Sequence, residues 1–92
     1  MAEVNVRFPP HLRRFINLPT SCDAEGESMA DLMDNLENQF AGVKNYLLHE
    51  NGELRQHVNL FLDGKLVVEK QLKSVDLGDA SELVIMQALS GG

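Results

Sequence analysis

The sequence has little cysteine and no long apolar run, and each scarcity excludes a class of protein. Cys22 is the only cysteine, so the chain can form neither an internal disulfide nor a cysteine-rich zinc site. No apolar run reaches the roughly 18 residues of a transmembrane helix. The first ten residues lack the basic-then-apolar order of a signal peptide. We therefore expect a cytoplasmic protein with no membrane partner.

Basic residues are also scarce. Eight lysines and arginines stand against 14 aspartates and glutamates, which gives a formal net charge of −6 at pH 7. Phosphate backbones repel such a chain, so we do not expect nucleic acid as a partner. One stretch is notably acidic and is interpreted as solvated surface or, alternatively, as a docking face for a basic partner. Its acidic residues are Glu25, Glu27, Asp31, Asp34 and Glu37.

Catalytic motifs are missing as well. The three histidines lack metal-ligand spacing, no serine lies in a G-x-S-x-G motif, and the glycines are too dispersed for a phosphate-binding loop. Cys22 is followed by Asp23, whose charge disfavours a thiolate. We expect no catalytic residue, no metal site and no cofactor bound by this chain.

The first half of the chain predicts two strands and a helix. Residues 4–8 alternate apolar and polar side chains, with the period of two of a half-buried strand. Residues 12–19 are interpreted as a second strand in a hairpin with the first, and residues 21–27 as a loop. Ser28 is the expected N-cap of a helix that ends near Gly42. The apolar stripe of this helix consists of Met29, Leu32, Met33, Leu36 and Phe40.

The second half predicts a short helical turn at 43–48 and then three strands. The first of these begins at Val58, and Asp63-Gly64 is a two-residue hairpin signal that pairs it with residues 66–69. The last strand, residues 82–89, carries apolar side chains on both faces, which is typical of a central strand.

This order of elements predicts an α+β fold, with a mixed sheet of four to five strands and one main helix packed on one face. A single helix cannot cover both faces of the sheet. We therefore expect an apolar docking surface for a partner on the other face, with scattered surface residues as the alternative. The candidate docking residues are Phe61, Val84 and Met86.

The chain ends on Leu-Ser-Gly-Gly, directly after its most apolar segment. Gly91 and Gly92 have no Cβ atoms, so they form the slimmest extended chain and fit a channel too narrow for side chains. Five residues beyond the last strand reach about 17 Å, enough to deliver the terminal carboxylate to a buried site on another protein. We predict one domain over residues 1–92 with a flexible tail at about 89–92, in which Ser90 precedes the two glycines.

Three segments give the sequence a family resemblance. They are MADLMDNLENQFAG (29–42), RQHVNLFLDGK (55–65) and LGDASELVIMQALSGG (77–92). With them the chain resembles the ubiquitin-like β-grasp sulfur carriers of the MoaD/ThiS type, and within that group the carriers that supply sulfide for cysteine or other thiometabolites. The terminal Gly-Gly is the most specific element. Gln87 stands in the region where many relatives have proline.

The resemblance implies a β-grasp fold and a carrier function without enzymatic activity. An E1-like adenylating enzyme would use ATP to join Gly92 to AMP, and a sulfur donor would then displace AMP to leave a C-terminal thiocarboxylate. A sulfur-acceptor synthase would consume the sulfide in making cysteine, methionine, thiamine, molybdopterin or a secondary metabolite. The resemblance further implies a metalloprotease as a partner, which trims relatives that continue beyond the glycines.

Two other functions are compatible with the same residues. The chain could be a ubiquitin-like modifier that is conjugated through its C-terminal glycine, since that reaction also begins with adenylation. It could instead be a non-covalent β-grasp interaction domain in which the two glycines are incidental.

Overall fold

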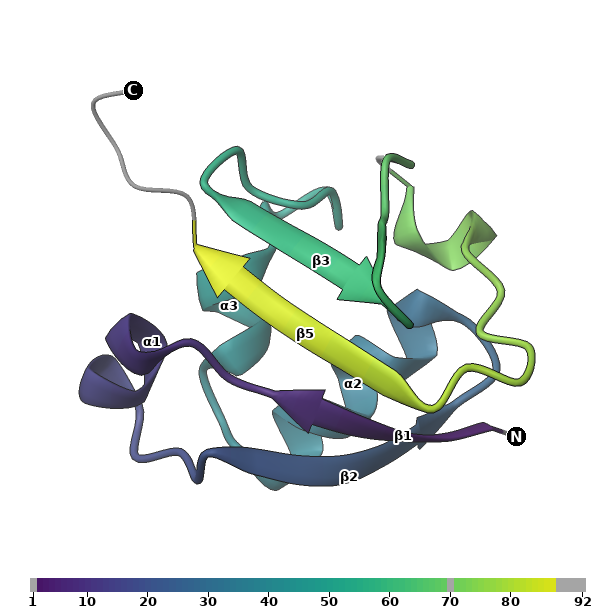
Figure 1. Cartoon of the computed structure of the whole chain (residues 1–92). Helices are drawn as coiled ribbons and strands as arrows, with labels where there is room; N and C mark the ends of the chain where they lie inside the picture. Colours follow the sequence, from purple (N-terminus) through teal and green to yellow (C-terminus); the bar gives the residue numbers. More distant parts are fainter. Residues whose placement is uncertain (1, 70, 88–92) are drawn as a thin grey trace.

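The computed structural model describes residues 2–69 and 71–87. These residues form a five-stranded mixed sheet with helices behind one face (Figure 1). The strands are β1 (Ala2–Arg7), β2 (Ser21–Gly26), β3 (Val58–Leu62), β4 (Lys65–Leu66) and β5 (Glu82–Gln87). The helices are α1 (Pro10–Phe15), α2 (Met29–Gln39), α3 (Val43–Leu47) and the 3-10 turn η1 (Leu72–Ser74).

Strand β5 lies in the middle of the sheet, as its two apolar faces predict (Figure 1). The strand order is β2-β1-β5-β3-β4. β5 runs parallel to β1 and antiparallel to β3, and Val84 is paired with both Arg7 and Phe61. Parallel neighbours need a long crossover connection, and the segment between β1 and β5 carries the helices across one face of the sheet.

Helix α2 begins where the sequence predicts. The N–H of Asp31 donates to Ser28 Oγ at 3.2 Å, and the N–H of Ser28 donates to Asp31 Oδ2 at 3.4 Å. This reciprocal pair is a capping box, which satisfies two N–H groups that the first helical turn leaves without partners. Four residues of the predicted stripe are fully buried, and each contributes roughly 1.5–3 kcal/mol by leaving water. They are Met29, Leu32, Met33 and Leu36.

The predicted strand at residues 12–19 is wrong, because Pro10–Phe15 form helix α1. Pro10 lies in the first helical turn, where a backbone N–H has no partner within the helix. The missing N–H of proline therefore costs no hydrogen bond there. Leu12 is fully buried, and its carbonyl accepts a hydrogen bond from the N–H of Ile16 at 3.1 Å. The spacing of these two apolar residues fits one helical turn as well as it fits alternation along a strand, and the packing of Leu12 into the core selects the helix.

The predicted loop at residues 21–27 is also wrong, because Ser21–Gly26 form strand β2. It pairs antiparallel with β1 from Ala2↔Gly26 to Arg7↔Ser21. Its inward side chains are small, and Ala24 is buried against the core. Small residues are required there because a Cβ on Gly26 would lie 2.8 Å from the backbone nitrogen of Leu32 in α2.

The sheet therefore has a covered face, packed on α2 and α3, and an open face on its other side (Figure 1). On β5, Leu83 and Ile85 point to the covered face and are 0% and 2% exposed. On β3, Val58 and Leu60 do the same. Successive side chains of both strands therefore point to opposite faces of the sheet.

Candidate functional site

The open face carries an apolar strip across three neighbouring strands. Phe61 of β3 is paired with Leu66 of β4 on one side and with Val84 of β5 on the other, so the three side chains lie in one row. Met86 lies on the same face two residues beyond Val84. Leu66 and Met86 are each 49% exposed, while Phe61 and Val84 are half-buried. We call these four residues the apolar strip.

Three of these four residues are the predicted docking residues, and the structure brings them together. Leu66 was not predicted as a docking residue, although the predicted turn at Asp63-Gly64 is enough to place it beside Phe61. A two-residue turn at 63–64 pairs residue 62 with 65 and 61 with 66, as the structure has them. Leu66 therefore shares the outward face of Phe61.

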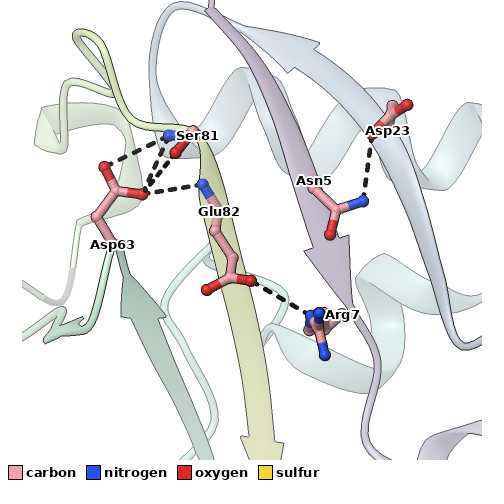
Figure 2. Close-up of polar contacts among 6 residues, drawn as sticks. All are labelled: Asn5, Arg7, Asp23, Asp63, Ser81 and Glu82. Carbon is pink, nitrogen blue, oxygen red and sulfur yellow. Dashed lines mark hydrogen bonds and ion pairs between the residues drawn. The ribbon is translucent and has the colours of Figure 1, made fainter.

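The other half of the open face is polar (Figure 2). Arg7 Nε lies 3.3 Å from Glu82 Oε2, which joins the parallel strands β1 and β5. Asn5 Nδ2 donates to Asp23 Oδ1 at 3.2 Å and joins β1 to β2. The apolar strip thus begins where β5 meets β3 and does not extend over β1 and β2.

The start of β5 is held by Asp63 (Figure 2). The carboxylate accepts from the backbone N–H groups of Ser81 at 3.1 Å and Glu82 at 2.9 Å. The N–H of Asp63 in turn donates to the carbonyl of Glu82 at 2.9 Å. The bonds from Ser81 and Glu82 favour the ionised carboxylate and lower the pKa of Asp63 below its ordinary value. The β3–β4 turn therefore fixes the strand that carries Val84 and Met86.

A groove of about 840 Å³ opens at the other end of β5. Its walls come from the corner between β1 and α1, from the end of β5 and from the residue before β3. Among the residues that line it are Pro9, His11, Arg13, His57, Met86 and Gln87. Met86 belongs to both the groove and the apolar strip, so the two surfaces are continuous.

A row of aromatic and imidazole rings lies at the same end of β5. The ring centroids of His11 and Phe15 are 5.0 Å apart, those of Phe15 and Tyr46 6.0 Å, and those of Tyr46 and His57 6.0 Å. Gln87 Nε2 donates to the hydroxyl of Tyr46 at 3.1 Å. This contact fixes the last described residue of β5 against α3.

Comparison with known proteins gives structural neighbours only. No protein-family model and no curated protein sequence matches the chain. A chain of the Amycolatopsis orientalis BexX/CysO complex aligns with a TM-score of 0.80 and 27% identity, covering 97% of this chain and 99% of that one. Mycobacterium tuberculosis CysO, described as an antigen, aligns with 0.78 and 22% identity over 94% and 99%.

A third neighbour is small archaeal modifier protein 1 from Methanosarcina acetivorans, with a TM-score of 0.77, 22% identity and coverage of 100% of this chain and 98% of that one. All three align with this chain over nearly their full lengths. The chain has the ubiquitin-like β-grasp fold. The likeness to these neighbours confirms the fold that the resemblance predicts from the sequence.

The predicted tail residues of this β-grasp chain, Ser90, Gly91 and Gly92, lie outside the described residues. Their role stays a prediction. Gln87 is the last described position before them and forms part of the groove. The groove and the apolar strip are therefore the described surfaces nearest in sequence to the tail.

The thiol of Cys22 is half-buried at the start of β2. Burial first, and then the charge of Asp23, raises the pKa of this thiol above its ordinary value. At neutral pH the group is therefore held as an unreactive thiol, in agreement with the sequence interpretation. Among residues 2–69 and 71–87, no three His, Cys, Asp or Glu side chains cluster as metal ligands would, and no helix could cross a bilayer.

Proposed function

We propose that this chain is a sulfur carrier that is activated at the carboxylate of Gly92. The observation that carries the proposal is the placement of β5. It is the central strand, its outward apolar side chains Val84 and Met86 belong to the apolar strip, and in the sequence it is followed directly by the final Ala-Leu-Ser-Gly-Gly. A protein that docks on the strip lies beside the point where the tail leaves the sheet.

The chemistry of the proposal belongs to the terminal carboxylate. In the first step one carboxylate oxygen attacks the α-phosphorus of ATP, pyrophosphate leaves, and an acyl-adenylate forms. In the second step hydrosulfide attacks the acyl carbon and AMP leaves, which gives a thiocarboxylate. If the donor is a persulfide, the attack gives an acyl disulfide, and a second thiol then attacks the donor's sulfur, releases the thiocarboxylate and leaves with the donor as a disulfide. The sulfur of the thiocarboxylate is nucleophilic at neutral pH and attacks an electrophilic acceptor. ATP and the catalytic groups are supplied by an E1-like adenylating enzyme, and the acceptor by a synthase.

Two kinds of observation support a carrier or modifier over an enzyme. The neighbours CysO and small archaeal modifier protein 1 are small β-grasp proteins of this kind. CysO has been crystallised in complex with BexX, which is consistent with a β-grasp carrier that works through partner proteins.

Intact mass spectrometry tests the proposal. Cys22→Ser protein, which has no thiol, is incubated with ATP, an E1-like enzyme and sulfide. We expect a mass increase equal to the replacement of one oxygen by sulfur, localised to Gly92 by fragmentation. The matched variant Gly92→Ala should fold unchanged and fail to be activated, because its Cβ clashes with the walls of a channel built for glycine. An unmodified Gly92 under conditions that thiolate a known carrier would reject the proposal.

Conjugation to proteins is the second candidate, and the likeness to small archaeal modifier protein 1 favours it. Here the adenylated Gly92 is transferred to a lysine amine and forms an isopeptide bond. Immunoblots of cell extract distinguish the two: a modifier gives products of higher mass that disappear in Gly92→Ala, whereas a carrier gives the free thiocarboxylate alone. A non-covalent interaction domain would keep its function when one residue is added after Gly92.

A further inference from the structure

The groove at the end of β5 differs in charge from the rest of the molecule. The chain as a whole carries 14 acidic against 8 basic side chains. Among the described residues that line the groove there is no aspartate or glutamate, whereas Arg7, Arg13, His11 and His57 all line it. Arg7 is partly neutralised by Glu82 at 3.3 Å. The guanidinium of Arg13 has Thr20 as its hydrogen-bond partner, through Nη1 at 3.2 Å, and no carboxylate within ion-pair distance among the described residues.

Two buried polar atoms of groove-lining residues lack hydrogen-bond partners within the described structure. One is Nε of Arg13, a donor, and the other is Oε1 of Gln87, an acceptor. Buried polar atoms are nearly always paired in folded proteins, and leaving them unpaired is costly. A ligand in the groove that pairs with both atoms would remove that cost.

The remaining wall of the groove is apolar. Phe8, Pro9, Pro10, Val84 and Met86 contribute to it. Sulfate offers acceptors for Arg13 but no donor for Gln87, and neither sulfate nor phosphate offers an apolar surface. A peptide with an acidic side chain offers all three: a carboxylate for the guanidinium, a backbone N–H for the amide oxygen, and neighbouring apolar side chains.

We propose that the groove binds a polypeptide segment of a partner protein that presents one carboxylate side chain between apolar residues. Arg13 binds the carboxylate, Gln87 Oε1 accepts from the segment's backbone, and Met86 continues the contact onto the apolar strip. The inference rests on the proposed function, since the partner is the protein that acts on the tail. Gln87, the last described residue before the tail, lines the groove.

Nuclear magnetic resonance titration of the intact chain tests this without any enzyme. The probes are N-acetylated, C-amidated pentapeptides of sequence GLXLG, with X as aspartate, asparagine or lysine. We expect saturable shifts of the amides of Arg13, His57, Met86 and Gln87 with the aspartate peptide. The asparagine peptide should bind about fivefold more weakly, because a charge-assisted hydrogen bond is lost, and the lysine peptide more weakly still.

Three variants test whether the side chain of Arg13 causes the preference for the aspartate peptide over the asparagine peptide. Arg13→Gln should abolish the discrimination between aspartate and asparagine peptides, and Arg13→Lys should retain part of it. Arg14→Gln is the matched control, since Arg14 is the exposed next residue of α1 and makes the same change of charge outside the groove. It should leave the discrimination intact. Spectra of each free variant verify the fold.

The inference would be overturned by no saturable binding, by shifts centred elsewhere, by equal affinity for the aspartate and lysine peptides, or by equal effects of the Arg13 and Arg14 variants. These outcomes are separate from the test at Gly92. Thiocarboxylate formation without peptide binding would reject the proposed peptide site in the groove and support the carrier function. Peptide binding with an unmodified Gly92 would support the peptide site and reject the carrier function.

Discussion

Adjacent residues of β5 have opposite surroundings. Leu83 and Ile85 are enclosed between the sheet and its helices, whereas Met86 is 49% exposed and Val84 is half-buried on the open face. All four are apolar, so hydrophobicity alone does not separate them. The difference is that the covered face meets elements of this chain, while the open face has an apolar strip with no element of the described chain over it.

That contrast separates two roles within one strand. The inward side chains stabilise the sheet, and the outward ones are available to a partner. Variants on the two faces should therefore affect different measurements: unfolding for the covered face, and activation or binding for the open face.

The largest effect is expected from Leu83→Ala on the covered face. Removing a fully buried leucine leaves a cavity, and the free energy of unfolding should fall by about 2–5 kcal/mol. Denaturant unfolding of the variant and the wild type measures this. A loss within about 0.5 kcal/mol would show that the covered face is not the core.

A smaller loss is expected from Gly26→Ala, where β2 approaches α2. The added Cβ would lie 2.8 Å from Leu32 N and 3.0 Å from Asp31 Cβ, so backbone must move. We expect a loss of about 1–3 kcal/mol in the free energy of unfolding. Glu25→Ala, the exposed neighbour on the opposite face of β2, is the control and should change it by no more than about 0.5 kcal/mol.

Acid should weaken two carboxylate anchors, those of Asp63 and Glu37, before it affects the core. The pKa of Asp63 is lowered by the Ser81 and Glu82 amides, and that of Glu37 by hydrogen bonds from the N–H groups of Gly42 and Lys44. A carboxyl whose pKa is lower in the folded state stabilises the fold above its unfolded pKa. That contribution is lost as pH falls below about 4 and through the folded pKa.

Unfolding measured between neutral and strongly acidic pH tests this. Asp63→Asn should show a shallower loss of stability in acid than the wild type, because one of the two titrating anchors is gone. An identical acid profile in the variant and the wild type would mean that Asp63 does not anchor β5.

The smallest effect on stability is expected from Met86→Ser on the open face. Its side chain is half exposed, so the free energy of unfolding should change by no more than about 0.5 kcal/mol. The KM of the activating enzyme for this carrier should nevertheless rise. An unaltered KM, with Val84→Ser also neutral, would show that the strip is not a docking surface.

The sequence alone predicted the parts of this protein whose pattern is local. Ser28, Asp31 and the apolar stripe of α2 determine a capped amphipathic helix, and Asp63-Gly64 determines a hairpin whose register places Leu66 beside Phe61. The two apolar faces of residues 82–89 indicated a central strand, and β5, described over residues 82–87, has that place in the sheet. The tail glycines were identified from the sequence, and their role remains a prediction.

Only the tertiary structure decided the region between β1 and α2. The residues of β2, Ser-Cys-Asp-Ala-Glu-Gly, have little strand propensity, and they form a strand because β1 pairs with them and α2 leaves room only for small side chains. The spacing of Leu12 and Ile16 is compatible with either a helix or a strand. The burial of Leu12 in the core selects the helix. The groove, too, depends on α1, since residues of that helix meet the end of β5 only in the folded chain. The local sequence pattern determines whether a segment is a helix or a strand when residues of that segment make its stabilising contacts. Long-range packing determines it when those contacts come from other parts of the chain.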